Sequence, residues 1–461
     1  MYKKNSHIHF MGIGGIGMSA IAHILSEKGF RVSGCDSDCT QKSVEKLKVL
    51  GCTISEGNNS VSCNDKTIDI LVRSTAISNA NPEILKAQER GVPIIHRSEM
   101  LAELMRTQYS IGVTGSHGKT TTSSLLAHIL LEAQLDPTVI VGGHIATIDN
   151  NAHYGKGPFL VAEADESDRS LLNLPICHGV LTGIDLEHLE TYKDIDDVVT
   201  TFKTFLEKIP FYGTAFVCAD DKNSRTLIPQ LKNKISYGIH ESSDWQINNV
   251  TLNADDSFFY LKHSTTIYGQ FTLSLPGIHN VKNATAALIV AHTLGVSFEV
   301  IKAALSSFKG VDRRFTYKGT YNGAQVFDDY GHHPEELFYS FKVARKKTKG
   351  KLWVLFQPHR FSRTQALWNE FIEVLTSSDI DELILTDIYP ASEEPREGIT
   401  SQKLLKDIQE KAPHLRASYQ VIDTDFKTLE AYLKQELQSG DLLLLQGAGK
   451  VNKIAPKLTL S

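Results

Sequence analysis

The residues best suited to chemistry form a glycine-rich stretch from Gly112 to Thr122, with the sequence GVTGSHGKTTT. Between a strand and a helix, such a loop presents backbone N–H groups to phosphate oxygens, a lysine to the β- and γ-phosphates and a hydroxyl to Mg²⁺. Here these two side chains are Lys119 and Thr120. The full pattern GxxxxGK[ST] fails at Val113, which stands where the first glycine is expected. The stretch still predicts a site for ATP and Mg²⁺.

A second phosphate-binding pattern lies near the N-terminus, where residues 12–17 read GIGGIG. It follows a short apolar strand and opens a helix, so its glycines let the backbone approach a diphosphate at the positive end of that helix. Asp36 ends the next predicted strand, where a carboxylate can bind a ribose hydroxyl. The pattern specifies a diphosphate attached to ribose, and NAD, FAD and a UDP-sugar are all compatible with it.

An ATP site also needs carboxylates for its metal, and the sequence LVAEADESD at residues 160–168 supplies them. An apolar strand runs here into four acids, and α/β proteins bind ligands at the carboxyl ends of such strands. Because Mg²⁺ prefers oxygen ligands, Glu163 is the first candidate, while the other three acids are also compatible with a solvated loop. His188 follows another predicted strand, but imidazole suits zinc better than magnesium.

Basic and aromatic residues follow two predicted strands in the last third of the chain. Residues 328–334 read DDYGHHP, and residues 356–364 read FQPHRFSRT. Arg360 and Arg363 can each bind a carboxylate or a phosphate through two hydrogen bonds, which lysine cannot do. Two adjacent histidines rarely converge on one metal ion, so we expect them to contact a substrate or to pack within the domain.

The elements that must position these residues form three α/β blocks, expected at residues 1–107, 108–316 and 317–461. Strands that alternate with helices predict parallel sheets with right-handed crossovers. Alternating apolar residues from Trp245 to Leu275 predict a small antiparallel section. The principal strands are expected at residues 7–10, 30–34, 68–72, 92–95, 109–113, 158–162, 179–183, 324–327, 352–356, 382–385 and 442–445.

Composition argues against several other classes of protein. The 461 residues are 41% hydrophobic and 22% charged, which is typical of a soluble chain with roughly three domains. The net charge of −5 gives no reason to expect nucleic acid. Six cysteines without a CxxC pair indicate reduced thiols rather than a disulfide scaffold. No apolar run is long enough to cross a membrane, so we expect a cytoplasmic protein that is a monomer or a weak homodimer.

Taken together, these segments resemble the Mur ligases, a bacterial family that builds the peptide of peptidoglycan on a UDP-sugar. The resemblance covers essentially the whole chain and keeps the order of the motifs, from the glycine fingerprint through GSHGKTT, EADESD, HNVKN and DRRF to DDYGHHP and FQPHRFSRT. It implies a Rossmann-like N-terminal domain for the UDP-sugar, a central P-loop ATPase-like domain for ATP, and a Rossmann-like C-terminal domain for the amino acid and nucleotide. The last two motifs look like those of the member that uses L-alanine.

The resemblance also implies roles for individual residues. Contacts with ATP are implied for Gly115, Ser116, His117, Gly118, Lys119, Thr120, Thr121, His279, Asn280, Asn283, Arg314 and Asp329. Contacts with the UDP-sugar are implied for Gly12, Gly14, Gly15, Gly17, Met18, Asp36, Ser74, Thr75 and Ala76. Contacts with the amino acid are implied for Tyr330, His332, Arg360 and Arg363. Metal ligation is implied for Thr120, Glu163 and His188, and a direct part in catalysis for Lys119, Glu163, His188 and Arg314.

In the reaction that the resemblance implies, the lactoyl carboxylate of UDP-N-acetylmuramate attacks the γ-phosphate of ATP, and the amine of L-alanine then attacks the resulting acyl-phosphate. The chain departs from the family pattern at Ser116, where threonine is usual, and at Glu187, where aspartate is commoner and the extra methylene would shift a metal ligand. Three other interpretations stay open: a sister ligase that attaches a preformed tripeptide, a nicotinamide oxidoreductase, and a non-catalytic nucleotide switch. The oxidoreductase leaves the phosphate loop unexplained, and the switch leaves the C-terminal arginines and histidines unexplained.

Overall fold

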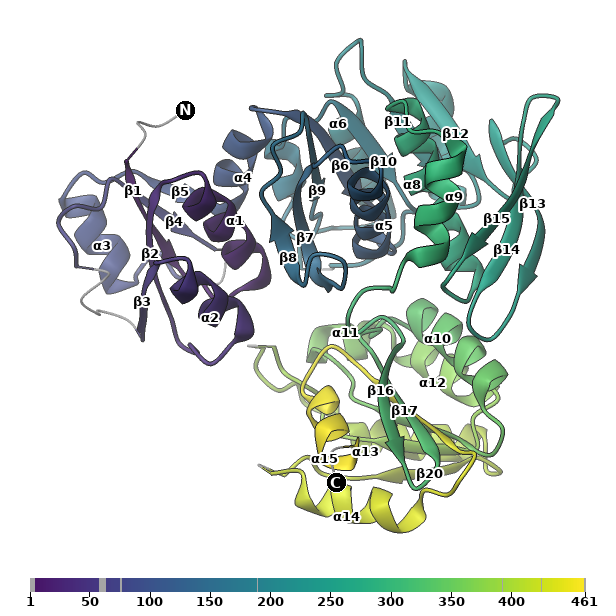
Figure 1. Cartoon of the computed structure of the whole chain (residues 1–461). Helices are drawn as coiled ribbons and strands as arrows, with labels where there is room; N and C mark the ends of the chain where they lie inside the picture. The colour runs from purple at the N-terminus through teal and green to yellow at the C-terminus, as the bar shows by residue number, and fades with distance from the viewer. Residues whose placement is uncertain are drawn as a thin grey trace. The chain divides into compact units, whose positions relative to one another are not determined.

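The computed structural model describes residues 5–57, 64–74, 77–188, 190–391, 393–423 and 425–459 (Figure 1). Thr75 and Ala76, two of the predicted UDP-sugar contacts, lie outside the described residues. The chain divides into two compact units. The first unit consists of Met1–Val250, Phe258–Leu273 and Asn280–Lys309, and the second consists of Thr251–Ser257, Ser274–His279 and Gly310–Ser461.

Five parallel strands form the N-terminal sheet, in the order β3-β2-β1-β4-β5. The strands are β1 (His7–Met11), β2 (Arg31–Asp36), β3 (Thr53–Glu56), β4 (Ile70–Arg73) and β5 (Ile94–His96), and the helices are α1 (Ile16–Glu27), α2 (Lys42–Val49), α3 (Pro82–Glu89) and α4 (Arg97–Met105). All five residues of β1 are buried, as in parallel strands that helices cover on both faces. The strand order reverses beside β1, so the glycine-rich loop at residues 12–17 leaves the sheet at the point where α/β folds bind ligands.

Ten strands form the central sheet, in the order β15-β14-β13-β12-β11-β10-β6-β9-β7-β8. They are β6 (Tyr109–Thr114), β7 (Thr138–Ile145), β8 (Asn150–His153), β9 (Phe159–Glu163), β10 (His178–Leu181), β11 (Ala215–Cys218), β12 (Lys234–Gly238), β13 (Trp245–Leu252), β14 (Ser257–His263) and β15 (Thr266–Leu273). The middle of the sheet is parallel, with β6 between β9 and β10. The phosphate loop and the acidic run therefore leave neighbouring strands at the same edge.

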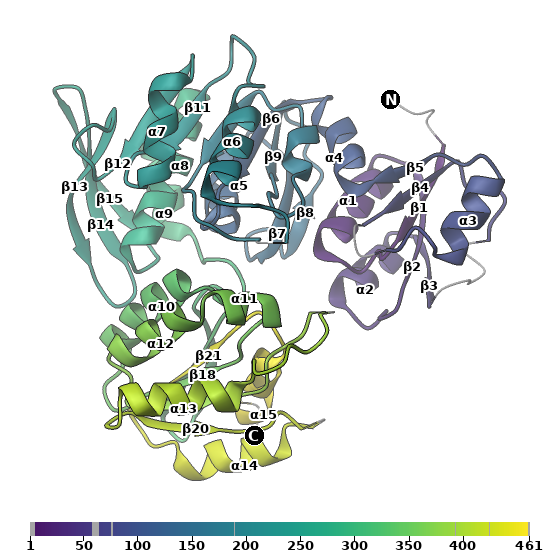
Figure 2. The same cartoon turned by 180° about the vertical axis from the view of Figure 1, so that it is seen from behind.

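Helices cover both faces of the central sheet. They are α5 (Lys119–Glu132), α6 (Ile195–Leu206), α7 (Lys222–Leu227), α8 (Ile278–Thr293) and α9 (Phe298–Ser307), with short 3₁₀ turns η1 (Ser170–Asn173) and η2 (Ile228–Gln230). Figure 1 shows α5, α8 and α9 in front of the sheet, and Figure 2, seen from behind, shows α6 and α7 over the opposite face. Ten consecutive residues of α5, from Thr121 to Leu130, are buried, which fixes the helix that begins at the phosphate loop.

Six strands form the sheet of the second unit, in the order β16-β17-β21-β18-β19-β20. The strands are β16 (Thr316–Tyr321), β17 (Ala324–Asp329), β18 (Leu352–Phe356), β19 (Glu382–Leu385), β20 (Arg416–Tyr419) and β21 (Leu442–Gln446). The helices are α10 (Pro334–Lys347), α11 (Phe361–Ala366), α12 (Trp368–Ser377), α13 (Ser401–Lys411), α14 (Lys427–Glu436) and α15 (Ala455–Thr459), with η3 (Val451–Ile454). Separate apolar clusters lie on its two faces, and β16 adds an antiparallel edge to an otherwise parallel sheet.

The predicted α/β class with several parallel sheets is confirmed. The sequence did not predict β3, β7, β8, β11, β12, β16 or β20. β8 and β16 lie at sheet edges and carry mostly polar residues, whereas β7 lies inside the sheet and continues from four buried residues, Thr138–Val141, into two glycines. The expected boundary after residue 316 falls within β16 (Thr316–Tyr321). Within the described part of the chain, no helix is both long and apolar enough to cross a membrane.

Candidate active site

The phosphate loop joins β6 to α5, and its glycines are required by space as well as by conformation. Gly115 and Gly118 have φ angles of +128° and +84°, a region that other residues rarely adopt. A Cβ at Gly115 would lie 2.2 Å from Thr182 Oγ1, and one at Gly118 would lie 2.4 Å from Asn283 Oδ1. Gly118 caps α5, so the first amides of that helix are directed at the loop. The predicted anion-binding geometry is therefore present.

Lys119 is folded back onto this loop. Its ammonium donates hydrogen bonds to the carbonyl oxygens of Gly115 at 2.6 Å and Ser116 at 3.1 Å. It also lies 2.7 Å from Glu166 Oε1, and both side chains are largely buried. Burial alone would lower the pKa of Lys119, but the charge of Glu166 outweighs it and raises that pKa. A permanent positive charge is thus held where phosphates would lie.

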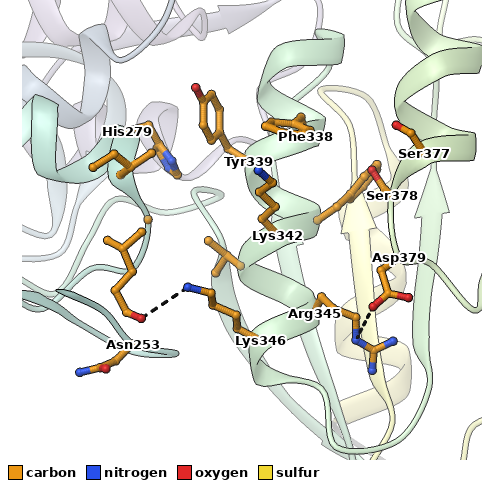
Figure 3. Close-up of a pocket in the computed structure, with 15 residues that line it drawn as sticks. Asn253, His279, Phe338, Tyr339, Lys342, Arg345, Lys346, Ser377, Ser378 and Asp379 are labelled. Carbon is orange, nitrogen blue, oxygen red and sulfur yellow. Dashed lines mark hydrogen bonds and ion pairs between the residues drawn. The ribbon is translucent and has the colours of Figure 1, made fainter. Parts of the chain in front are cut away.

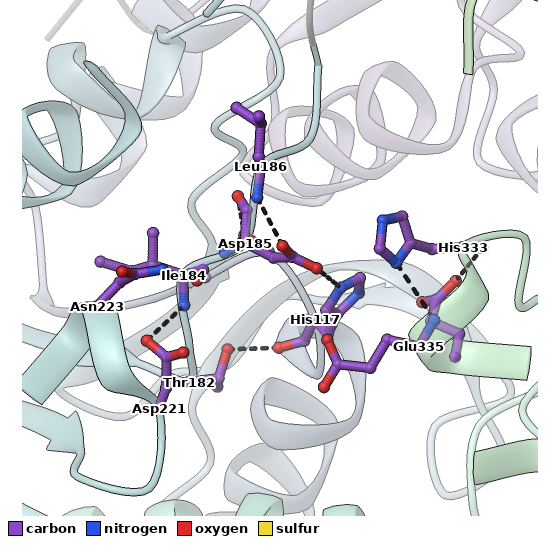
Figure 4. Close-up of polar contacts among 12 residues, drawn as sticks. His117, Thr182, Ile184, Asp185, Leu186, Asp221, Asn223, His333 and Glu335 are labelled. Atoms are coloured by element: carbon purple, nitrogen blue, oxygen red, sulfur yellow. Dashed lines mark hydrogen bonds and ion pairs between the residues drawn. The ribbon is translucent and has the colours of Figure 1, made fainter. Parts of the chain in front are cut away.

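The segment that follows β10 holds the loop from its other side (Figure 4). Ser116 Oγ donates to the Asp185 carbonyl at 3.1 Å and accepts from the Asp185 amide at 2.8 Å. His117 Nε2 lies 3.5 Å from the Asp185 carboxylate. The segment is anchored in turn because the Ile184 amide donates to Asp221 Oδ1 at 3.1 Å. The phosphate loop is therefore held between the end of β6 and the segment after β10, through the contacts of Ser116 and His117 with Asp185.

The structure groups His188 with Glu166 and Glu187, whose ligand atoms all lie within 4.8 Å of one another. His188 has a left-handed φ of +55°, and its Nε2 is 3.7 Å from Glu166 Oε1. Burial alone would lower the pKa of His188, but the carboxylates around it, Glu190 first, raise it. One imidazole and two carboxylates at this spacing form a candidate metal centre.

Glu163, the carboxylate that the sequence favoured as a metal ligand, makes different contacts. Its Oε1 accepts from the Gly142 amide at 2.9 Å and from Ser123 Oγ at 3.3 Å. Glu166, which was not among the predicted site residues, is only 2% exposed. The burial of Glu166 depends on a distant part of the chain, since the Tyr192 hydroxyl donates to its carbonyl at 2.6 Å. Nothing in the local sequence distinguishes Glu166 from the neighbouring acids.

The N-terminal glycine loop is fixed by Asp36. The Gly14 amide donates to Asp36 Oδ2 at 2.8 Å, and the Asp38 amide donates to Oδ1 at 3.1 Å. Gly12 has a φ of +78°, which suits glycine at this turn. The Met18 side chain is buried in the apolar core, so its contribution to this loop is its position in the first turn of α1.

Arg97, which the sequence did not suggest, lies against the glycine loop. A Cβ added to Gly17 would meet its guanidinium at 2.4 Å. The same guanidinium is 3.4 Å from Asp165 Oδ2 in the acidic run. Arg97 begins α4, where the helix dipole does not favour a positive charge. The position of its guanidinium is therefore set by the contacts with Gly17 and Asp165.

Three of the ATP contacts that the resemblance implies, His279, Asn280 and Asn283, divide between the two units. Asn283, on α8, packs against Gly118 in the first unit, where Asn280 also lies. His279 belongs to the second unit, where its ring centroid is 5.0 Å from that of Tyr339. His279 and Tyr339 line a cavity of about 620 Å³ beside α10, with Lys342 and Lys346 on the same helix (Figure 3).

Asp329 organises the end of β17 in the second unit. Its carboxylate accepts hydrogen bonds from the amides of Phe315 and Gly331, both at 2.8 Å. It also accepts from Ser340 Oγ at 3.0 Å and from Gln446 Nε2 at 2.8 Å. With four donors on a buried carboxylate, Asp329 holds the DDYGHHP segment in shape.

Arg314 lies beside the same segment. Its guanidinium is 3.3 Å from Glu336 Oε1 and 5.7 Å from the centre of the Tyr330 ring. Burial alone would lower the pKa of Arg314, but Glu336 and then Asp329 raise it. His332 Nδ1 lies 3.0 Å from the Tyr330 carbonyl, which fixes this imidazole against the loop.

His359, within FQPHRFSRT, connects the predicted amino-acid contacts. Arg363 donates to His359 Nδ1 at 3.3 Å, and the His359 ring lies 5.4 Å from that of His332. Burial, then the nearby positive charges, lower the pKa of His359 to about 3, so its ring is neutral and can accept this bond. Arg360 makes a different contact, 4.0 Å from Glu393 Oε1. His359 was not among the predicted site residues, because the sequence alone does not distinguish it from the other residues of the motif.

Comparisons with known proteins cover the whole of this arrangement. Three family models match the chain in succession: "Mur ligase family, catalytic domain" at residues 7–109, "Mur ligase middle domain" at 113–291 and "Mur ligase, glutamate ligase domain" at 313–449. The chain belongs to the Mur ligase family. The first two Mur ligase models contain the glycine loop and the phosphate loop, and the third contains Arg314, Tyr330 and Arg363.

Individual Mur ligases match over nearly the full length. The UDP-N-acetylmuramate–L-alanine ligase of Syntrophus aciditrophicus is 43% identical over 99% of this chain and 94% of its own. The enzyme of the same name from Desulforapulum autotrophicum is 44% identical over 99% of both chains. Among solved structures, the UDP-N-acetylmuramate-alanine ligase of Thermotoga maritima has a TM-score of 0.82, with 25% identity over 98% of both chains.

Proposed function

We propose that this chain is an ATP-dependent ligase that joins L-alanine to the lactoyl carboxylate of UDP-N-acetylmuramate. The observation that carries the proposal is the identity of 43–44% to the two alanine ligases over 99% of the chain. The largely buried Lys119 ammonium on a phosphate loop supports the use of ATP. Neither the nicotinamide oxidoreductase nor the non-catalytic switch explains this combination.

The first step transfers a phosphoryl group. A carboxylate oxygen of the lactoyl group attacks the γ-phosphorus, the bond to the β-γ bridging oxygen breaks, and ADP leaves with that electron pair. Lys119 and the first amides of α5 offset the negative charge that spreads over the phosphoryl oxygens. Because the loop is fixed through Ser116 and Asp185 beforehand, these donors need no reorganisation during the transfer.

The second step forms the amide. The neutral amine of L-alanine attacks the acyl carbon, loses a proton, and expels inorganic phosphate. We assign Tyr330, His332 and Arg363 to the amino-acid side, since His359 joins two of them into one group. A guanidinium such as that of Arg363 can hold the carboxylate of alanine through two parallel hydrogen bonds. Arg314 is assigned to the phosphate side because its guanidinium carries a positive charge, which Glu336 and Asp329 stabilise.

The residues around His188 fit a divalent metal. The carboxylates of Glu166 and Glu187 offer hard oxygen ligands for Mg²⁺, His188 adds an imidazole nitrogen within 4.8 Å of them, and Thr120 supplies a hydroxyl on the phosphate loop. When bound, Mg²⁺ offsets charge on the β- and γ-phosphate oxygens. Glu166 contacts both Lys119 and His188, so this carboxylate links the lysine to the metal ligands.

The glycine loop at residues 12–17 is assigned to the diphosphate of the UDP-sugar. Its backbone lies at the start of α1, and Asp36 holds it in shape through Gly14. Arg97 extends this site, because its guanidinium lies against Gly17 and carries positive charge. Ser74 lies at the end of the neighbouring strand β4 (Ile70–Arg73), close to Gly12.

Phosphate release measured with purified protein, Mg-ATP and UDP-N-acetylmuramate tests the proposal. Release should require L-alanine, and neither another amino acid supplied singly nor the tripeptide should replace it at equal concentration. The tripeptide is the necessary comparison, since a solved UDP-N-acetylmuramate:L-alanyl-γ-D-glutamyl-meso-diaminopimelate ligase is 27% identical over 67% of this chain. Release that needs the tripeptide and not L-alanine would contradict the proposal.

A further inference from the structure

A row of polar side chains crosses the face of the N-terminal sheet that α3 covers. His9 on β1 lies beside Ser33 on β2, and Cys35 follows two residues later on the same face. Glu83, in the first turn of α3, completes the row. All four residues are buried, each at most 3% exposed, and their neighbours include Met11 and other apolar side chains. Polar groups in such surroundings need compensating partners.

Three ligand atoms of this row converge. One nitrogen of His9, the sulfur of Cys35 and a carboxylate oxygen of Glu83 all lie within 4.8 Å of one another. Cys35 Sγ is 3.3 Å from Glu83 Oε2. His9 Nδ1 lies 2.8 Å from Ser33 Oγ, whereas the buried Nε2 makes no hydrogen bond to any residue that the structure describes. Ser33 therefore occupies Nδ1 and leaves Nε2 as the nitrogen that can bind a ligand.

We propose that His9, Cys35 and Glu83 bind one Zn²⁺ ion inside the N-terminal domain. Imidazole, thiolate and carboxylate are the three ligand types that zinc takes in proteins. A thiolate and a carboxylate together carry two negative charges, so the complex with Zn²⁺ is neutral and suits a buried position. Ligand atoms around tetrahedral zinc lie roughly 3.5 Å apart, so the cluster needs to contract by about 1 Å at its widest.

The surroundings of His9 match those of a metal-binding imidazole. Such a histidine donates its other N–H to a hydrogen-bond acceptor, which fixes the ring. Ser33 Oγ can accept from His9 Nδ1 and donate to His7 Nε2, which is 2.7 Å away. A zinc ion here would also fix the end of β2, next to Asp36, whose carboxylate holds the glycine loop. The ion stabilises the domain and takes no part in phosphoryl transfer.

Cobalt binding to the whole protein tests this proposal, after metal is removed by dialysis against a chelator. Co²⁺ replaces Zn²⁺ in such sites, and a thiolate ligand gives it a charge-transfer absorption band. We expect one equivalent of Co²⁺ with this band, and its displacement by Zn²⁺. Ligands at the ATP site are nitrogen and oxygen, so Co²⁺ bound there gives no thiolate band.

Variants locate the ion. Cys35→Ser should abolish the band, and Ser33→Ala should weaken Co²⁺ binding about 10- to 100-fold. Cys39→Ser and Cys52→Ser are matched controls in the same domain and should keep the thiolate absorption band. Zn²⁺ should raise the Tm of the wild type but not that of Cys35→Ser. If Cys35→Ser does not fold, His9→Gln replaces it, with Co²⁺ affinity expected to fall at least about tenfold.

Three results would overturn the proposal. The first is a folded wild type that gives no thiolate band with Co²⁺, which would leave a metal-free cluster of hydrogen bonds. The second is a band that persists in Cys35→Ser. The third is a band that Cys39→Ser removes, which would move the thiolate ligand to another cysteine.

Discussion

Replacing Lys119 with methionine tests the electrostatic design of the phosphate loop. The change removes an ammonium that lies 2.7 Å from Glu166 Oε1 and that also donates to two loop carbonyls. The Glu166 side chain is only 3% exposed, so its carboxylate stays behind without this cation and with little access to water. We expect both stability and phosphoryl transfer to suffer, for separable reasons.

The size of the stability effect follows from burial. Removing one partner of a buried ion pair costs about 3–5 kcal/mol, because the other charge is left uncompensated. In Lys119→Met/Glu166→Gln both charges are absent, so the double variant should recover roughly 1–3 kcal/mol of that loss. Burial already raises the pKa of Glu166, so its protonated form favours folding and stability falls as pH rises above about 4.5. This loss should be larger and extend to higher pH in Lys119→Met, because the ammonium that opposes the rise in the pKa of Glu166 is missing.

Hydrogen exchange of peptides that span α5 gives the local free energy of opening for each variant. The surface pair Lys203–Glu207 is the matched control, with 3.9 Å between the charged atoms and both side chains at least 36% exposed. Lys203→Met should change stability by about 0–1 kcal/mol, with almost no coupling to Glu207→Gln. Phosphate release should be lost in both Lys119 variants, whatever their stability.

Two outcomes would refute this reasoning. If the double variant is no more stable than Lys119→Met, the residual charge of Glu166 is not the cause of the loss. If Lys119→Met still releases phosphate at a rate close to that of the wild type, the ammonium does not act on the transferred group. The expected loss is about 100- to 1,000-fold in kcat, the usual effect of removing one charge-stabilising donor.

Three further predictions follow from single contacts. Gly118→Ala should abolish ATP binding measured by calorimetry, because the new Cβ overlaps the Asn283 side chain. Gly29→Ala is the control: Gly29 also has a positive φ but has open space around it, so this variant should still bind ATP. Burial raises the pKa of Asp328 to about 6, so the protonated form of this carboxyl favours folding. The wild type should therefore lose up to about 3 kcal/mol of its free energy of unfolding as pH rises from 4 through 6. Asp328→Asn should remove this pH dependence, as measured by unfolding in urea. Arg97→Ala should weaken UDP-sugar binding about tenfold in calorimetry, with Arg106→Ala, an exposed arginine just after the same helix, as the control. A tight UDP-sugar complex in Arg97→Ala, a Gly118→Ala protein that binds ATP, or an unchanged pH profile in Asp328→Asn would each contradict the corresponding contact.

Local sequence signals predicted the loops correctly, because their requirements are local. A glycine with positive φ, a lysine at the start of a helix and a buried strand all act within a few residues. The strands predicted at residues 109–113 and 352–356 therefore match β6 and β18 closely. The parallel sheets follow from the alternation of strands with helices, which needs no knowledge of individual contacts.

Contacts between distant segments could not be read in this way. Glu166 is buried because Tyr192 returns over it, and Arg97 is placed by Gly17 and Asp165 from two other segments. His359 differs from its neighbours only through the charges that surround it in the folded chain. Each of these residues carries an ordinary local pattern, and its function depends on packing that one sequence does not reveal.

The path of one oxygen atom tests the central claim most directly. UDP-N-acetylmuramate labelled with ¹⁸O in its lactoyl carboxylate, incubated with Mg-ATP, L-alanine and the protein, should give inorganic phosphate that carries one ¹⁸O per turnover. This transfer is required because the carboxylate oxygen bonded to phosphorus leaves with phosphate when the amine attacks. If the phosphate carries no ¹⁸O after full turnover, the reaction does not pass through an acyl-phosphate, and the proposed mechanism is wrong.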